Sequence, residues 1–354
     1  MDWKHSKHMQ GKDIKPLHLK DKMSISDFIN NYENSSFEAR NVAAGARLFE
    51  HMINSNDTIW LGIAGAVIVG GMGGYVIDLM EKGFIDAVCS TGAQVYHDLH
   101  FAFNLPVKHG SPNVDDNELR KDGTTRIYDI NIREKETLMA QDKIIIDFAK
   151  KCNIKEDFSS ADLNYELGKY VLENAPNPEN SWLAEAAKLK VPVFWDSLAN
   201  HSIGLNLAKI YLEGKNIVPN PNLDILESAA ILYSTGSSGF FEFGGGGPKN
   251  FIQQMAPTIS QILGINYEGA DRGIQITTAH ERDGGLSGCT FGEAVTWGKY
   301  KDAHHGLVQV WGEVSVIAPL IFWYSVENCK ARPLKNLMSR KKEFYEKLVK
   351  DAKK

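Results

Sequence analysis

The chain has 354 residues, 43% of them hydrophobic and 23% charged, which is typical of a globular protein with a substantial core. This length allows one to three domains, and we expect one large domain. The formal net charge of −5, with most positive clusters near the two ends, argues against a nucleic-acid partner. The four cysteines lack CxxC spacing, so we expect reduced thiols in a cytoplasmic protein, without disulfides or a metal site.

The N-terminus is polar and lacks the apolar core of a secretory signal. Residues 59–77 are uncharged and about long enough to span a bilayer. Six glycines interrupt this stretch, and each interior glycine weakens a helix by about 1 kcal/mol. We therefore expect a buried strand that runs into a turn and a helix, and no membrane partner.

Three regions follow from composition. Residues 1–38 show little periodicity and are interpreted as an N-terminal arm. Residues 39–330 are expected to form a single catalytic domain. Residues 331–354 form a basic tail with a helical pattern, typical of a solvated helix, to which we assign no function.

Apolar runs alternate with helical patterns through the middle of the chain. Strands are predicted at 58–64, 84–89, 127–132, 191–195, 239–243, 274–278 and 307–311. Helices are predicted at 39–53, 75–81, 182–189, 205–213, 250–263 and 316–329. This alternation predicts an α/β fold with a mostly parallel sheet and helices on both faces. Ligands should then bind at the carboxyl ends of the strands.

A run of four glycines, residues 244–247, follows one predicted strand and precedes Pro248 and Lys249. Bare backbone lets amide groups approach a pyrophosphate at a helix N-terminus, although the run can equally be a plain loop. No GxGxxG pattern follows the first strand.

Lys299 closes a stretch that begins with Glu293 and includes Trp297. A lysine forms a Schiff base only as the free amine, which requires desolvation or a neighbouring positive charge, and Trp297 could supply a dry wall. Composition alone leaves open that Lys299 is a surface lysine at a helix end.

Several motifs occur together in one order along the chain. They are Phe37-x-Ala39, Ser90-Thr91-Gly92, the glycine turn with Lys249, and the Glu-Ala-Val-x-Trp-Gly-Lys string that ends at Lys299. In this respect the chain resembles the deoxyhypusine synthase family, and in particular its bacterial-type, deoxyhypusine synthase-like members. The resemblance spans roughly residues 35 to 325.

The resemblance implies a Rossmann-like, NAD-binding subunit in a homotetramer, with NAD and a polyamine at subunit interfaces. It also implies a cycle in which NAD takes a hydride from spermidine and the resulting imine passes to Lys299. The butylimine then goes to an acceptor amine, and NADH returns the hydride. The acceptor in this family is a protein lysine, or putrescine in related homospermidine synthases.

The resemblance also assigns site residues. Glu293 and Trp297 match the carboxylate and indole around the lysine, and Glu313 replaces an aspartate that binds the adenosine ribose. Positions implied to contact the dinucleotide, or alternatively to pack at strand ends, are Thr91, Asn200, Gly244, Gly245, Gly246, Thr278 and Ala279.

The chain departs from the family where the polyamine binds. Leu205 and Leu286 stand where two aspartates hold the distal ammonium of spermidine. Each lost charge-assisted hydrogen bond would cost about 1.5 to 3 kcal/mol. Asn250 replaces a histidine, His97 a carboxylate near the reacting amine, and Asn200 a ribose-contacting aspartate.

New histidines occur at His97, His201 and His280, and one of them could replace the missing general base, although a lone histidine is often structural. We therefore hypothesise an NAD-dependent aminoalkyl transferase acting through Lys299 between small amines, of homospermidine or agmatine type. Two alternatives remain open: an orthodox deoxyhypusine synthase that modifies a protein lysine, and an inactive NAD-binding scaffold or sensor.

Overall fold

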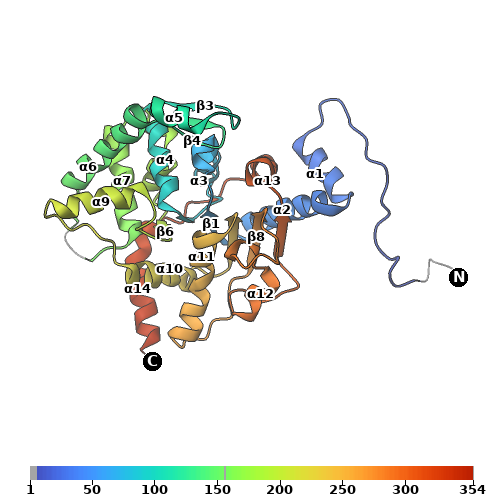
Figure 1. Cartoon of the computed structure of the whole chain (residues 1–354). Coiled ribbons are helices and arrows are strands. Elements are labelled where there is room, and N and C mark those ends of the chain that lie inside the picture. The colour runs from blue at the N-terminus through green and yellow to red at the C-terminus, as the bar shows by residue number, and fades with distance from the viewer. Residues whose placement is uncertain (1–5, 155–156, 354) are drawn as a thin grey trace.

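The computed structural model describes residues 6–154 and 157–353 (Figure 1). Residues 1–5 of the predicted arm and Lys354 of the predicted tail lie outside this range. No helix of the described residues is long and apolar enough to cross a membrane. The glycine-rich stretch 59–77 forms strand β1, the short helical segment η2 (Ile68–Met72) and the start of helix α3, as predicted.

The main sheet of the described residues has six strands, all parallel. Its strands are β1 (Thr58–Ile63), β2 (Ala87–Ser90), β6 (Val193–Trp195), β7 (Ser238–Phe243), β8 (Arg272–Thr277) and β9 (Leu307–Trp311). They lie in the order β6-β2-β1-β7-β8-β9, which is the order of doubly wound α/β sheets. The prediction of a parallel α/β sheet is confirmed.

Fourteen α-helices surround and extend this sheet within the described ranges (Figure 1). They are α1 (Ile25–Glu33), α2 (Phe37–Asn54), α3 (Gly73–Glu81), α4 (Gly92–Ala102), α5 (Asp116–Asp122), α6 (Ala140–Lys151), α7 (Ser160–Asn174), α8 (Trp182–Leu189), α9 (Ser202–Leu212), α10 (Pro221–Ser234), α11 (Gly246–Pro257), α12 (Phe291–Thr296), α13 (Val314–Asn328) and α14 (Leu337–Ala352).

Strand side chains alternate between two hydrophobic cores because successive residues of a strand point to opposite faces. Ile59, Leu61 and Ile63 join the core covered by helices including α2, α3 and α13. Trp60 joins the core covered by α10, α11 and α14. Helices on both faces therefore explain why apolar side chains of β1 are buried on both sides of the sheet.

The predicted strand at 127–132 is wrong. Two antiparallel strands, β4 (Thr124–Ile127) and β5 (Ile130–Arg133), form a hairpin there, and β5 also pairs with β3 (Val107–His109). Tyr128 lies in the tight turn between them with a positive φ of 51°. This left-handed backbone reverses the chain where the apolar run had suggested continuity.

The two ends of the chain differ in how they meet the body. Residues 6–24 run as an extended, mostly exposed segment away from the sheet (Figure 1). Helix α1, within the predicted arm, packs on α2 and α13 through the buried Ile25 and Ile29.

The basic tail is not a helix solvated on all sides. Helix α14 packs against α10 and buries Leu337, Phe344 and Leu348. Lys341 is 7% exposed, and its Nζ lies 2.7 Å from an Asp162 oxygen and also contacts the Glu227 carboxylate. One lysine of the tail thus ties α14 to α7 and α10.

Replacing this lysine should destabilise the fold, because Glu227 would be left as an unpaired buried carboxylate. We expect Lys341→Met to lower the free energy of unfolding by about 3 kcal/mol, measured by urea denaturation. The exposed neighbour Lys342 is the control, and Lys342→Met should change stability by less than about 0.5 kcal/mol. Equal losses in both variants would contradict a specific anchor.

Candidate active site

The sheet order places a crevice between β1 and β7. Connections leave these two strands toward opposite sides of the sheet, so the loops at their carboxyl ends separate and leave room for a ligand. The glycine turn at residues 244–247 follows β7, and α11 begins within it. The glycine turn therefore lies at the edge where the sheet order predicts ligand binding.

Lys299 lies directly after the short helix α12 and opens into a cavity of about 380 Å³. The lysine is only 6% exposed. The cavity brings together five of the residues singled out in the sequence, namely Asn250, Leu286, Glu293, Trp297 and Lys299. The cavity is therefore the candidate active site, called here the Lys299 pocket.

The amine of Lys299 is held in a setting that favours its neutral form. Its Nζ lies 3.1 Å from Oδ1 of Asn250, which is a neutral acceptor. Burial lowers the pKa of Lys299, and the nearby positive charge of Lys249 lowers it further. A neutral amine is the nucleophilic form. Lys299 is therefore buried, unlike the surface lysine that composition alone left open, and its catalytic role stays a prediction.

The pocket also contains two carboxylates that the sequence reasoning missed. Glu281 and Asp283 line it together with Glu293. They follow β8, in the loop that leads to Leu286 and Cys289. The signal was present in the string His-Glu-Arg-Asp, but only the fold shows that this loop faces Lys299.

The glycine turn is fixed by contacts with this same loop. The Gly246 amide donates to Ser287 Oγ at 3.2 Å, and a Cβ at Gly245 would lie 2.5 Å from the Ser287 Cα. At Gly246, by contrast, a Cβ would meet no atom within 4 Å, and φ is +57°. The turn is therefore held closely on one side and open on the other.

Polar groups without partners cluster at the neighbouring strand ends. Oδ1 of Asp196 and Nε2 of His201 are both buried and have no hydrogen-bond partner within the described residues. Asp196 follows β6 and lies against Gly247, and His201 lies against Gly92 at the start of α4. The open backbone at Gly246 and the two unsatisfied polar atoms fit the groups that bind a dinucleotide.

The other predicted cofactor residues lie at the same edge of the sheet. Thr91 is the N-cap of α4, and Glu313 is the N-cap of α13 and accepts from the Val316 amide at 3.2 Å. Thr278 and Ala279 directly follow β8. Asn200 lies in the loop between β6 and α9. Their roles in cofactor binding stay predictions.

Comparison with known proteins identifies the family. The family model for deoxyhypusine synthase matches residues 27–325. A deoxyhypusine synthase-like protein of Nostoc sp. is 36% identical over 98% of this chain and 92% of that relative. The chain belongs to the deoxyhypusine synthase family. Family membership supports a transferase of aminobutyl groups in general.

Two further comparisons agree with this assignment. A deoxyhypusine synthase-like protein of Caulobacter vibrioides is 32% identical over 86% of this chain and 85% of that relative. A crystal structure of a candidate deoxyhypusine synthase from Entamoeba histolytica covers 90% of this chain and 99% of that one, with a TM-score of 0.56. Its 16% sequence identity limits that likeness to the fold.

Some predicted residues of this family member do not reach the Lys299 pocket within one chain. His97 lies on α4, where its Nδ1 is 3.0 Å from Nε2 of His100, and burial lowers the pKa of His97 to about 4. His280 stacks on Trp311 with ring centroids 5.7 Å apart. Leu205 is exposed on α9. Catalytic roles for the two histidines stay predictions.

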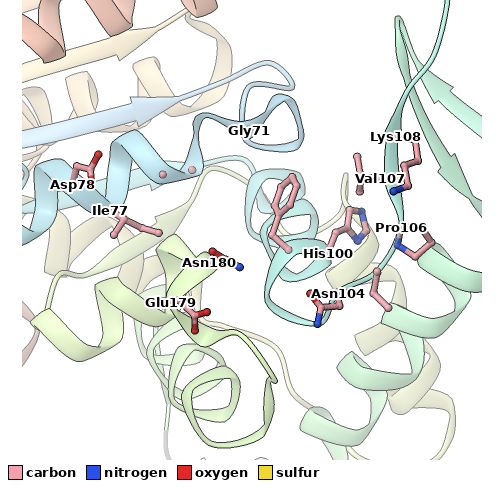
Figure 2. Close-up of a pocket in the computed structure, with 14 residues that line it drawn as sticks. Gly71, Ile77, Asp78, His100, Asn104, Pro106, Val107, Lys108, Glu179 and Asn180 are labelled. Atoms are coloured by element: carbon pink, nitrogen blue, oxygen red, sulfur yellow. The ribbon is translucent and has the colours of Figure 1, made fainter.

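The largest cavity lies elsewhere. It measures about 700 Å³ and is lined by residues of α3, the end of α4, β3 and the segment before α8 (Figure 2). His100, Asn104, Asp78 and Glu179 are among them, and no residue of the Lys299 pocket is. Size alone would therefore select a different cavity from the one that contains the predicted residues. In the described part of the chain, no three His, Cys, Asp or Glu side chains form a group that could hold a metal.

The lowered pKa of Lys299 predicts reactivity at unusually low pH. A group with a depressed pKa loses its proton earlier as pH rises, so Lys299 should undergo reductive methylation by formaldehyde and a borane at lower pH than exposed lysines. Peptide mass spectrometry across pH 6–10 measures this, with the exposed Lys342 as the internal control. Coinciding profiles would show that the pocket does not depress the pKa.

Proposed function

We propose that this protein is an NAD-dependent aminoalkyl transferase that carries the transferred group as an imine on Lys299 and works between small amines. The proposed reaction is of the homospermidine type or the agmatine type. The observation that carries the proposal is a buried amine, Lys299, opening into a cavity lined by Glu281, Asp283 and Glu293. Such a pocket attracts cationic amines and supplies a nucleophile for their oxidised form.

The chain's own residues account for the transfer step. NAD, bound at the glycine turn, would supply the hydride acceptor for the donor amine and return the hydride at the end. Lys299 Nζ attacks the carbon of the oxidised donor's C=N bond, and the leaving amine departs with a proton as the lysine imine forms. An acceptor amine then attacks the same carbon and releases Lys299.

Asn250 and the carboxylates have distinct roles in this scheme. Asn250 Oδ1 accepts from Lys299 Nζ and so orients the nucleophile without exchanging a proton. Among the carboxylates that line the pocket, Glu293 lies closest in sequence to Lys299, and it is proposed as the acid or base for the departing and arriving amines. Trp297, 64% exposed at the rim, offers a face for an ammonium group.

The part of the pocket proposed to bind the distal end of the substrate differs from what the family resemblance implies. Leu286 lines the cavity where the family resemblance predicts an aspartate. Glu281 and Asp283 lie in the same loop and are proposed to bind an ammonium in its place. A displaced anchor suits an amine whose length or charge spacing differs from that of spermidine.

Association into the proposed homotetramer is supported by exposed apolar surface. Helix α13 carries Val316 and Trp323, 65% and 56% exposed, beside the exposed Tyr75 of α3. Large apolar side chains gathered on neighbouring helices are typical of subunit interfaces. Subunit contacts would also cover the rim of the Lys299 pocket at Trp297.

Borohydride trapping tests the proposal directly. Protein incubated with NAD and a small diamine, then reduced, should gain the mass of the aminoalkyl group on Lys299. The Lys299→Arg variant should gain none while keeping its NAD affinity. An adduct that survives in Lys299→Arg would show that another residue is the nucleophile.

The donor used in this trapping experiment separates the alternatives. An adduct formed only with spermidine, and passed to a protein lysine, would favour the orthodox enzyme. Tight NAD binding without any adduct would favour the scaffold or sensor.

The displaced anchor makes a second prediction. The double variant Glu281→Gln, Asp283→Asn should raise KM for the preferred amine by about 10- to 100-fold, because two charge-assisted contacts are lost. Steady-state kinetics measure KM, and Glu179→Gln in the largest cavity is the matched control. An unchanged KM in the double variant would place the ammonium elsewhere.

A further inference from the structure

A carboxylate is buried directly beneath the Lys299 pocket. Glu242 lies on β7, a central strand, where it pairs in register with Gly62 of β1 and Gln275 of β8. Its side chain is fully buried. A carboxylate in the middle of a sheet is costly unless something nearby compensates its charge.

The hydrogen bonds of Glu242 connect it to the segment that carries Lys299. Its Oε1 accepts from Gln253 Nε2 at 2.8 Å and from the Tyr300 hydroxyl at 3.1 Å. Tyr300 directly follows Lys299 and is itself buried. The second oxygen, Oε2, has no hydrogen-bond partner within the described residues. Two neutral donors hold the carboxylate in place but do not balance its charge.

The compensating charges come from two lysines. Lys249 of α11 is 3% exposed, and its Nζ donates to Gln275 Oε1 at 3.0 Å and to the Cys289 carbonyl at 2.7 Å, both neutral acceptors. Lys299 directly precedes Tyr300, whose hydroxyl donates to Glu242, and the positive charge of Lys299 also acts on the carboxylate. The facing residues of β1 and β8, Gly62 and Gln275, carry no charge. The negative charge of Glu242 therefore interacts with the positive charges of two buried amines.

We propose that Glu242 is a positioning residue that sets the protonation state of Lys299 from beneath the pocket by balancing the charge of Lys249. The inference rests on the proposed role of Lys299 as an amine nucleophile. With the balance in place, Lys299 can hold a proton between turnovers and release it when the imine forms. Without it, the uncompensated charge of Lys249 would lower the pKa of Lys299 further.

The electrostatics agree in direction with this arrangement. Burial raises the pKa of Glu242 to about 7, and the charges of Lys249 and Lys299 act against that rise. Burial lowers the pKa of Lys299 and the charge of Lys249 lowers it further, whereas Cys289, Glu242 and Glu293 act in the opposite direction. Each group thus faces the others across an interior where charge interactions are weakly screened.

A charge-pair cycle on the intact protein tests the proposal through the reductive-methylation profile of Lys299, which needs neither NAD nor substrate. Glu242→Gln keeps the shape of the side chain and removes its negative charge. The midpoint, which is the pH at which methylation of Lys299 is half-maximal, should therefore fall by about one unit, which means a rate about tenfold higher on the acidic side of the profile. Lys249→Met should raise the midpoint, and the double variant should return it toward that of the natural protein.

Two results of this cycle would contradict the proposed role of Glu242. An unchanged midpoint in folded Glu242→Gln, or shifts of the same sign in both single variants, would overturn the proposal, because a packing defect does not reverse sign with charge. If Glu242→Gln does not fold, Tyr300→Phe removes one donor to the carboxylate and should shift the midpoint downward by less. Unchanged reactivity there would equally overturn it.

Failure of the proposed function is distinguishable from failure of this inference. Borohydride trapping with NAD and an amine reports the transfer reaction, whereas methylation reports only the ionisation of Lys299. The expected sign pattern without any trapped adduct would keep the charge balance and reject the transferase.

Discussion

A primary amine kept nearly out of water is the constraint on which the rest of this site depends. Burying an ammonium is costly, so the protein must either neutralise Lys299 or compensate it. Asn250 gives the amine a neutral hydrogen-bond acceptor, which suits the uncharged form. The charge of Glu242 acts in the other direction and favours the protonated form. The central strands, the start of α11 and the turn after α12 all meet at this amine, which ties the packing of the sheet to the chemistry of the pocket.

The order of the parallel strands explains where that pocket can be. Because the connections diverge at β1 and β7, the glycine turn lies at the edge where the strand order predicts a ligand. Ser287 holds the turn from the loop that also carries Glu281 and Asp283. The proposed dinucleotide site and the proposed amine site are thus built from one loop and one turn, so the proposed cofactor would lie beside the proposed substrate.

Within the deoxyhypusine synthase family, this chain keeps the lysine proposed as nucleophile and differs at positions of the proposed amine pocket. Lys299, Glu293 and Trp297 stand together as the resemblance implied, whereas Leu286 removes a charge from the cavity wall. Glu281 and Asp283 restore negative charge at a different place. Retained reaction chemistry with a moved anchor is the pattern expected when a family keeps its covalent step and changes the molecule that it carries.

The sequence by itself determined the parallel α/β sheet and singled out Lys299 as a candidate, because strand periodicity and a contiguous motif are local properties of the chain. It was wrong at 127–132, where the backbone of Tyr128 reverses the chain. Only the tertiary structure decided that Glu281 joins Lys299, that His97 pairs with His100 instead, and that Glu242 lies beneath the amine. These contacts join residues far apart in sequence, and burial, which sets their charge states, exists only once the elements pack.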